Sequence, residues 1–441
     1  MNRYMCTTFK AILLSSVFFF FFFEASADEN TVVFDADREI NKRLDEMQTI
    51  VEPGNKNLVR WKISSYLDRD PQSTEKMLGR MVQYFPLIEA KLRAADMPED
   101  LKFLPIIESS LRPDAVSHMG AVGIWQFMYY TGRENGLRIN RVVDERRDPI
   151  AATDAAIRYL ASLHERFGDW TLAIAAYNSG PGRVERAIRY SNSRNFWDLM
   201  RFLPRETRQY IPKYLAAAYL CKHYQDHGLE PQWPSLDLQL IGDMKVYNTL
   251  SLYKVSEWTG LPYRDIRAMN PGYRKGYIPA SSSGYRLILP KRMISLVKAR
   301  MKGMNSDVRK ADDAPYIEAV YKVRPGETVE KIADIFELNP THLEYWNGLE
   351  EGEKLCAGQE LKMYLQRSKR NEWLIRDRAR LELDPLPPRP IDRIARAPIS
   401  PDYPKAHSSA AFVEGIMSRQ SITIRRGQGL REAAIKKTGT R

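Results

Sequence analysis

The chain has 441 residues, of which 44% are hydrophobic, and it carries a formal net charge of +12. This length predicts about two to four domains of ~100–200 residues each, with enough apolar content for a core of ~150 residues. A basic chain favours anionic partners, but the usual nucleic-acid-binding motifs are absent, so we expect no nucleic-acid partner.

The N-terminus has the parts of a secretory signal peptide. Basic residues without any acid precede the apolar run Ala11–Phe23, and Ala25–Ala27 forms a small-residue cleavage site. The run is shorter than the ~20 residues that a membrane span needs, although an uncleaved anchor stays open as the alternative. Cys6 precedes the run and cannot be the lipid-acceptor cysteine. We therefore predict a signal peptide over residues 1–27 and a periplasmic or cell-envelope protein that is not a lipoprotein.

Helical spacing of apolar residues dominates the next part of the chain. Residues 28–72 are predicted to form a helical lead, and residues 73–230 a single domain. Within that domain, apolar residues recur at helical spacing over Ser73–Ala94, Ile150–Phe167 and Ile211–His223. No segment of the domain alternates with a period of two, which predicts an all-α fold.

Glu108 is the strongest candidate for a catalytic residue. It lies between an apolar stretch, Leu104–Ile107, and two serines, shortly before a Gly- and aromatic-rich turn, Gly120–Phe127. A carboxyl in an apolar wall has its charged form disfavoured, which raises its pKa. A carboxyl that stays protonated near neutral pH can donate a proton to a leaving oxygen, as cleavage of a glycosidic bond requires. Asp114 follows a proline and is expected to be a turn residue.

Three blocks of this domain resemble one known family. They are Pro105–Met128, Phe167–Val184 with its Ala-Tyr-Asn-x-Gly sequence, and Leu203–Ala216 with its Glu-Thr-x-x-Tyr-Ile sequence. In this order they resemble the lytic murein transglycosylases with a goose-type lysozyme fold, most closely the subfamily that also carries LysM repeats. The resemblance implies a lysozyme-like all-α domain without cofactor or metal. It also implies a lyase whose partner is the peptidoglycan glycan strand, cleaved between N-acetylmuramic acid and N-acetylglucosamine to leave 1,6-anhydro ends.

The same resemblance implies roles within the site. Glu108 would protonate the bridging oxygen and then, as a carboxylate, take the proton of the muramyl C6 hydroxyl. Ser117 would bond the acetamido group and help to hold Glu108, and Gln126 would line the floor of the cleft. Tyr177 and Asn178 match the family's Tyr-Asn pair, with the tyrosine hydroxyl near the reacting sugar.

Two further positions have a structural and a functional interpretation of equal weight. Glu206 and Tyr210 would close the cleft from its far side, or would serve as a helix cap and a packing residue. Trp125 stands where many relatives have Met or Leu, and we expect it to fill core.

A LysM module is predicted at residues 316–365. This segment opens with a Tyr-x-Val-x-x-Gly-Glu-Thr pattern and closes with Gly-Gln-x-Leu. It resembles the small βααβ unit that binds N-acetylglucosamine-containing chains. By that resemblance, glycan binding would fall to Gly326, Glu327, Thr328 and Asn347.

A degenerate LysM-like copy is predicted at residues 235–292. The apolar spacing of Val246–Asn270 recurs 77 residues later, in the module just described. Thr249 stands at the place of the first glycine and the Gly-Glu-Thr turn is missing, which leaves glycan binding by this copy open. A third, incomplete copy begins at residues 420–441 without a second helix or a closing strand.

The remaining features are interpreted as structural. Residues 366–418 are rich in Arg and Pro, which predicts a stiff, extended linker. Cys221 and Cys356 lie in different predicted domains, so no disulfide framework is expected. Cys221, His223 and His227 have helical ligand spacing, but a fourth ligand is not evident and an ordinary helix end is favoured over a metal site.

Three other functions remain open, of which a chitin-active enzyme is the third. A hydrolytic muramidase would share Glu108 and the fold, and the reducing ends of its products would differ. A non-catalytic LysM protein would bind the cell wall without cleaving it. In each case we expect association with the cell envelope and a monomeric protein.

Overall fold

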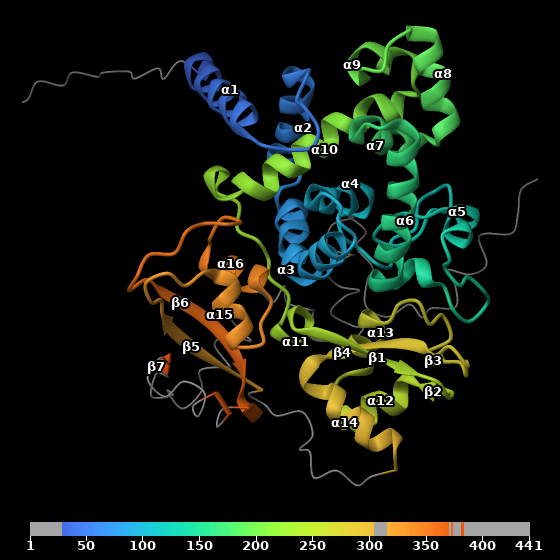
Figure 1. Ribbon diagram of the computed structural model, residues 1–441, viewed down its shortest axis with the longest axis vertical. Coiled ribbons are helices and arrows are strands. Elements are labelled where there is room, and N and C mark those ends of the chain that lie inside the picture. The colour runs from blue at the N-terminus through green and yellow to red at the C-terminus, as the bar shows by residue number, and fades with distance from the viewer. Residues whose placement is uncertain (1–28, 304–314, 370–371, 374–380, 383–441) are drawn as a thin grey trace, which may run out of the picture. The chain divides into compact units, whose positions relative to one another are not determined.

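The computed structural model describes residues 29–303, 315–369, 372–373 and 381–382 (Figure 1). The predicted signal peptide and the predicted third copy lie outside the described residues, as does nearly all of the predicted linker. The chain divides into two compact units, Met1–Gln48 and Thr49–Arg441. The described residues of the first unit form mainly one helix, α1 (Glu29–Glu46). None of the helices in the described ranges is long and apolar enough to cross a membrane.

Helices make up the first part of the second unit. In chain order they are α2 (Lys56–Asp68), α3 (Pro71–Ala94), η1 (Glu99–Phe103), α4 (Leu104–Ser109), α5 (Tyr129–Glu134), η2 (Glu145–Arg147), α6 (Pro149–Phe167), α7 (Trp170–Ser179), α8 (Pro181–Ser191), α9 (Phe196–Leu199), η3 (Met200–Phe202), α10 (Arg205–His223), η4 (Gln225–His227) and α11 (Leu236–Gln239). Over residues 73–230, all of which are described, the only strand-like pairing consists of isolated β-bridges. This confirms the predicted all-α domain.

The helix α2 packs against this helical domain, although residues 28–72 were expected to form a lead before it. It lies along α10 and also contacts α3. The Lys62 ammonium on α2 donates a hydrogen bond to the Gln209 side chain on α10 at 2.8 Å. Asn55 begins α2 by accepting the Leu58 N–H, as an N-cap residue does. Tertiary packing therefore makes α2 part of the domain.

The helix α7 lies in the interior of the domain. Its residues Leu172–Ala176 are all buried, because α6, α8 and α10 pack around it. Asp169 caps its first turn by accepting the Leu172 N–H at 2.7 Å. The buried stretch fixes the helix in place, and with it Tyr177 and Asn178 in the last turn.

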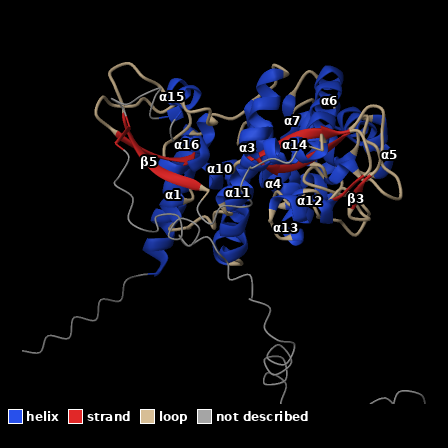
Figure 2. Ribbon diagram, turned by 90° about the horizontal axis from the view of Figure 1, so that it is seen from below, coloured by secondary structure: helices blue, strands red, loops and turns tan. Residues whose placement is uncertain are grey.

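Two βααβ modules follow the helical domain, which confirms the second part of the predicted fold class. Figure 2 shows the strands in red, and every named strand of the described residues belongs to one of these modules. The first module consists of β1 (Ile241–Val246), β2 (Leu250–Ser251), α12 (Leu252–Thr259), α13 (Tyr263–Met269), β3 (Tyr277–Ile278), β4 (Tyr285–Pro290) and α14 (Lys291–Met301). The second consists of β5 (Tyr316–Lys322), α15 (Val329–Ile335), α16 (Pro340–Asn347), β6 (Glu360–Gln366), η5 (Arg367–Lys369) and β7 (Leu381–Glu382). In each module the long first and closing strands pair antiparallel.

The repeat extends to one asparagine in each module. Asn270 donates to the Ile288 carbonyl at 2.7 Å and accepts the Ile288 N–H at 2.8 Å. Asn347 makes the same two bonds with Lys362, at 2.8 and 2.7 Å. Each asparagine thus joins the end of the second helix to the closing strand and satisfies the backbone groups of that strand.

One of the contacts that each module makes with the helical domain lies in the loop that follows its second helix. In the first module, Arg274 forms an ion pair with Asp144 of the helical domain. The matching position in the second module, 77 residues later, is Glu351, which pairs with Lys102 at 2.8 Å. One position of the repeat therefore meets the helical domain twice, with opposite charges.

The Lys102 ammonium is buried where the second module meets the helical domain. It pairs with Glu89 at 2.9 Å, and Thr341 of the module donates its hydroxyl to Glu89 at 2.6 Å. Burial alone would lower the pKa of Lys102, but the charges of Glu89 and Glu351 raise it above its ordinary value. The ammonium therefore stays charged in this contact.

Replacement of Lys102 tests whether this contact depends on charge. Lys102→Met is expected to lower the free energy of unfolding by roughly 3–5 kcal/mol, because it leaves Glu89 buried without a cation. Glu351→Gln is the matched control: its side chain is 59% exposed, so loss of that pair should cost about 1 kcal/mol or less. Urea denaturation followed by tryptophan fluorescence measures both variants. Equal losses would contradict the importance of the buried Glu89 charge.

Candidate active site

Glu108 lies at the C-terminal end of α4, a helix of six residues. Ser110 (φ 53°) and the residue after it have left-handed backbones, which end the helix and turn the chain away from it. Ser109 donates its hydroxyl to the Ile124 carbonyl at 2.9 Å. Arg80 donates to the Ser110 carbonyl at 2.8 Å. These bonds fix the last turn of α4 and so the direction of the Glu108 side chain.

The Glu108 carboxyl has buried surroundings and one tyrosine as its hydrogen-bond partner. Tyr210 on α10 donates its hydroxyl to Glu108 Oε1. Burial raises the pKa of Glu108 to about 7, against the bond from Tyr210, which lowers it, and together with the charge of Glu206, which raises it. Part of the residue remains exposed, so a ligand can reach it. Glu108 is therefore an acid that can gain or lose its proton near neutral pH.

Tyr177 stands beside this acid as a neutral phenol. Its ring packs against Trp125 and Phe127, with ring centroids 6.5 and 6.2 Å away. Its hydroxyl donates to the Trp125 carbonyl at 2.7 Å. Burial and the negative charge of Glu108 raise the pKa of Tyr177 well above its ordinary value. Three helices, α4, α7 and α10, thus bring Glu108, Tyr177 and Tyr210 together.

One loop, Ser117–Phe127, which we name the glycine turn, lies against α4 and α7 through the bonds from Ser109 and Tyr177. Gly123 has a φ of 87°, and a Cβ there would lie 1.7 Å from the Arg146 carbonyl oxygen, so only glycine fits. Gln126 has a left-handed backbone, with φ of 49°. Its amide donates to the Gly123 carbonyl at 2.8 Å.

Ser117 does not hold Glu108 as the resemblance implied. Its hydroxyl oxygen accepts the Ala121 N–H at 2.9 Å. Both Ser117 and Glu108 are described residues, and no hydrogen bond joins them. Ser117 instead closes the first part of the glycine turn, because serine oxygens readily accept backbone N–H groups in turns. Tyr210 bonds the Glu108 carboxyl directly, and Ser109 fixes its backbone.

Asn178 and Glu206 lie on the two helices that flank the acid. Asn178 Oδ1 accepts the Thr207 hydroxyl at 2.8 Å, which joins the end of α7 to the start of α10. Glu206 is exposed in the first turn of α10, one turn before Tyr210. It acts on Glu108 through its charge.

Three supporting residues were not identified from the sequence. Thr207 is buried and fixes Asn178, and Ser109 ties α4 to the glycine turn. Arg146 donates to the backbone carbonyls of Gly120 and Phe127, each at 3.2 Å. Thr207 stands inside the Glu-Thr-x-x-Tyr block, which was a usable signal, whereas nothing in the local sequence marks Arg146.

Two predictions about nearby residues are confirmed. Trp125 is fully buried and donates its indole N–H to the Thr153 hydroxyl at 3.0 Å, so it is a core residue. Asp114 is exposed in a turn, 3.5 Å from the side chain of Arg112.

The four predicted glycan-binding positions of the second module have structural contacts within it. Gly326 is exposed with a φ of 80°, and Thr328 caps α15. Glu327 accepts the Tyr321 hydroxyl at 2.8 Å, and Asn347 holds the closing strand. These contacts explain the turn and the strand, and glycan binding by these residues stays a prediction.

The two cysteines of the described ranges are free, and no group of three His, Cys, Asp or Glu side chains there is arranged to hold a metal. The predicted helix end around Cys221 has other bonds: His223 contacts Asp226, and His227 contacts Tyr219. The titratable group that the site offers near neutral pH is Glu108, which can give a proton and take one back.

Substitution of glycine tests the shape of the glycine turn. Gly123→Ala is expected to lower the thermal unfolding midpoint strongly, because its Cβ would overlap the Arg146 carbonyl oxygen. Gly120→Ala is the control, since its φ is also positive, at 83°, while nothing lies within 4 Å of a Cβ there. The control should lose only the ~1–2 kcal/mol of a left-handed alanine. Differential scanning calorimetry compares them, and equal losses would rule out the steric explanation.

Three family models match separate parts of the chain. Residues 85–200 match the Transglycosylase SLT domain. Residues 243–306 match the Lytic transglycosylase MltD, LysM-like domain, and residues 321–363 match the LysM domain. The first range lies in the helical domain, and the other two coincide with the two modules.

Individual relatives agree with these matches. Membrane-bound lytic murein transglycosylase D of Escherichia coli (strain K12) is 35% identical over 291 residues, which are 64% of this chain and 63% of that protein. The chain therefore spans less than two thirds of this relative. Peptidoglycan transglycosylase gp16 of Escherichia phage T7 is 40% identical over 79 residues, 18% of this chain and 6% of that protein.

Among solved structures, the 70 kDa soluble lytic transglycosylase Slt70 of Escherichia coli is 21% identical, with a TM-score of 0.31, over 45% of this chain and 34% of that one. The observed fold and the three family matches agree on the organisation of the chain. It carries a helical transglycosylase SLT domain, followed by two domains of the LysM type.

Proposed function

We propose that this chain is a lytic transglycosylase of peptidoglycan, which cleaves the β-1,4 bond between N-acetylmuramic acid and N-acetylglucosamine and leaves 1,6-anhydro ends. The observation that carries the proposal is the Glu108 carboxyl, whose pKa burial raises to about 7 while Tyr210 bonds its Oε1. A carboxyl with this pKa can act as an acid in one step and as a base in the next. The name of the Escherichia coli relative, a murein transglycosylase, supports the same substrate.

In the first step, protonated Glu108 gives its proton to the bridging oxygen. The bond between that oxygen and muramyl C1 breaks, and the N-acetylglucosamine side leaves with a free hydroxyl. The oxygen of the substrate's own acetamido group stabilises the positive charge at C1. An ordinary glycosidase would need a second carboxylate for this purpose.

In the second step, the muramyl C6 hydroxyl attacks C1, and the acetamido oxygen leaves it. The hydroxyl proton passes to the Glu108 carboxylate, which restores the starting acid, and no water is consumed. Because the nucleophile belongs to the substrate, its effective concentration is high. It outcompetes water where Tyr177, Tyr210 and the glycine turn exclude solvent.

The remaining predicted residues bind the sugars in this proposal. Ser117 uses only a lone pair on the Ala121 N–H, so its hydroxyl hydrogen can bond the acetamido group. The half-buried amides of Gln126 and Asn178 contact sugar polar groups. Glu206 tunes the acid through its charge.

The surroundings of the protein follow from the same proposal. A peptidoglycan substrate is found in the cell envelope, which fits the predicted signal peptide and a periplasmic location. The second module adds glycan affinity through the exposed turn that begins at Gly326. We propose that the protein works as a monomer on glycan strands.

A hydrolytic muramidase is the second candidate. The observation that favours it is the effect of the Glu206 charge on the pKa of Glu108. Among the described residues, Glu206 is the only other carboxylate whose charge acts on this pKa. An inverting hydrolase uses a second carboxylate to activate water on the opposite face of the sugar. In that mechanism Glu206 would be the base.

Digestion of purified sacculi followed by mass spectrometry of the released muropeptides separates the two candidates. We expect anhydro-muramic ends, which are lighter by one water than hydrolytic ends. Glu108→Gln should reduce release by roughly 10²–10⁴-fold, since it removes the acid. Glu206→Gln, the matched control, should keep anhydro ends with a far smaller loss of rate. Free reducing ends that disappear in Glu206→Gln would establish the muramidase instead.

The pH profile of kcat/KM tests the protonation state of Glu108. Since the acid must be protonated and its pKa is about 7, kcat/KM should fall as the pH rises through 7. Tyr210→Phe removes a bond that lowers this pKa and should move the fall to higher pH. Glu206→Gln removes a charge that raises it and should move the fall to lower pH. Asp114→Asn is the control without a shift, and shifts of the opposite signs would contradict the assignment.

A further inference from the structure

A chain of three charged side chains connects the first module to the glycine turn. Arg274 of the module pairs with Asp144. Arg146 donates its Nε and Nη2 hydrogens to the two carboxylate oxygens of Asp144, each at 2.9 Å. Arg146 in turn donates Nη1 to the carbonyls of Gly120 and Phe127, each at 3.2 Å. One guanidinium therefore holds the glycine turn at two places, Gly120 and Phe127.

The middle members of this series of side chains, Asp144 and Arg146, are buried. Asp144 has 0% and Arg146 5% of its surface exposed. Burial alone would raise the pKa of Asp144, but the bonds from Arg146 and Arg274 hold it below its ordinary value. Removal of one cationic partner from a buried carboxylate is destabilising. Arg146 and Arg274 thus share one buried carboxylate.

The backbones of the two parts also pair. The Asp144 N–H donates to the Gly272 carbonyl at 2.9 Å, and the Arg274 N–H donates to the Val142 carbonyl at 2.9 Å. A Cβ at Gly272 would lie 3.0 Å from the Asp144 carbonyl oxygen, so glycine permits this close approach. The bonds form an isolated antiparallel bridge between Val143 and Tyr273.

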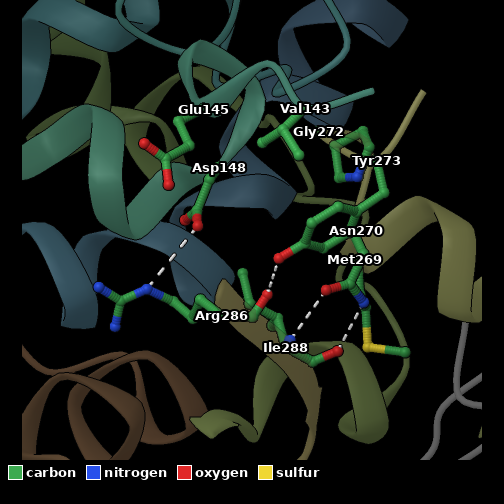
Figure 3. A pocket seen from close by; sticks show the side chains of 10 residues that line it. Val143, Glu145, Asp148, Met269, Asn270, Gly272, Tyr273, Arg286 and Ile288 are labelled. Atoms are coloured by element: carbon green, nitrogen blue, oxygen red, sulfur yellow. Dashed lines mark hydrogen bonds and ion pairs between the residues drawn. The ribbon is translucent and has the colours of Figure 1, made fainter. Parts of the chain in front are cut away.

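Figure 3 shows the side chains that line a small pocket beside this bridge. The cavity that remains there measures about 10 Å³, close to the space that one water molecule needs. Arg286 of the module faces Asp148 at 3.7 Å, and Asp148 caps the first turn of α6. Module and helical domain are therefore joined at more than one point.

In the first module, the segment that corresponds to the Gly-Glu-Thr turn of the second module stabilises this contact. At that place it forms β2, which pairs with β3 through Leu250 and Ile278. The Leu252 N–H donates to the Gly276 carbonyl at 3.0 Å. These bonds brace the segment 272–276, which carries Arg274.

We propose that the first LysM-like module is a positioning element of the active site and not a glycan-binding module, with Arg274 as its positioning residue. Through Asp144 it sets the glycine turn, whose carbonyls bond Ser109 and Tyr177 beside Glu108. The proposal rests on the proposed function only in taking this turn as part of the site.

The test compares Arg274→Ala with Lys275→Ala in the full chain. Lys275 is the neighbouring exposed cation, so both variants lose one positive charge from the same loop. Hydrogen exchange of peptides covering residues 117–127 should become faster in Arg274→Ala alone. Loss of the ion pair between Arg274 and Asp144 should let the glycine turn open locally. This measurement needs no enzymatic activity.

Kinetics on two substrates separate positioning from binding. On a short soluble glycan oligomer, Arg274→Ala should lower kcat by roughly tenfold or more, as misplacement of a site does, with little change in KM. In the Glu108→Gln background, cosedimentation with sacculi should be unaffected by Arg274→Ala. Arg274→Lys, which keeps the charge but not the fork of donors, should restore part of kcat. The assay counts cleaved glycosidic bonds and does not depend on whether the new ends are anhydro or hydrolytic. The test therefore remains valid if the enzyme proves to be a hydrolase.

Two results would overturn the proposal. One is exchange and kcat in Arg274→Ala equal to those of Lys275→Ala. The other is loss of sacculus binding with kcat on the short oligomer unchanged, which would make the module a glycan binder. If the alanine variant does not fold, Arg274→Gln, which removes the charge but keeps a donor, is judged by the same measurements.

Discussion

The burial of one carboxyl, that of Glu108, sets the demands on the rest of the site. Burial raises its pKa to about 7, while Tyr210 supplies a hydrogen bond that keeps the charged form accessible. These opposing effects place the group where it can exchange a proton in both directions. They persist only if α4, α7 and α10 keep their positions. Ser109 and Tyr177 hold α4 and α7 by bonding to carbonyls of a single loop. Thr207 joins α10 to α7 through Asn178.

The two repeats have kept one architecture and diverged in their surfaces. Asn270 and Asn347 make the same pair of bonds to their closing strands, and these bonds satisfy backbone groups of the strands. The second repeat leaves the turn at Gly326 exposed. The first has turned the matching segment into β2, which supports its contact with the helical domain. In our proposals, one repeat therefore serves the glycan and the other serves the catalytic loop.

Local sequence was sufficient for the helices, the two repeats and the apolar setting of Glu108, since these depend on periodicity and on near neighbours. The contacts that complete the site were harder to foresee. Tyr210 reaches Glu108 across 102 residues, and Arg274 reaches Asp144 across 130. Ser117 was expected to bond Glu108, but a nearer backbone N–H holds its hydroxyl oxygen. Periodicity shows which side chains are buried, and it does not show which partner a polar side chain meets after folding.

The opposite charges at Arg274 and Glu351 restrict how the tandem copies could ever be shuffled. Exchanging their order would set an arginine against buried Lys102 and a glutamate against buried Asp144. Like charges forced together away from water cost several kcal/mol by typical estimates. The charge at this position of each copy thus fits its own contact surface on the helical domain and is repelled by the other one. Moving either copy to the other position would therefore also require a change of the charged residue that it meets, Lys102 or Asp144.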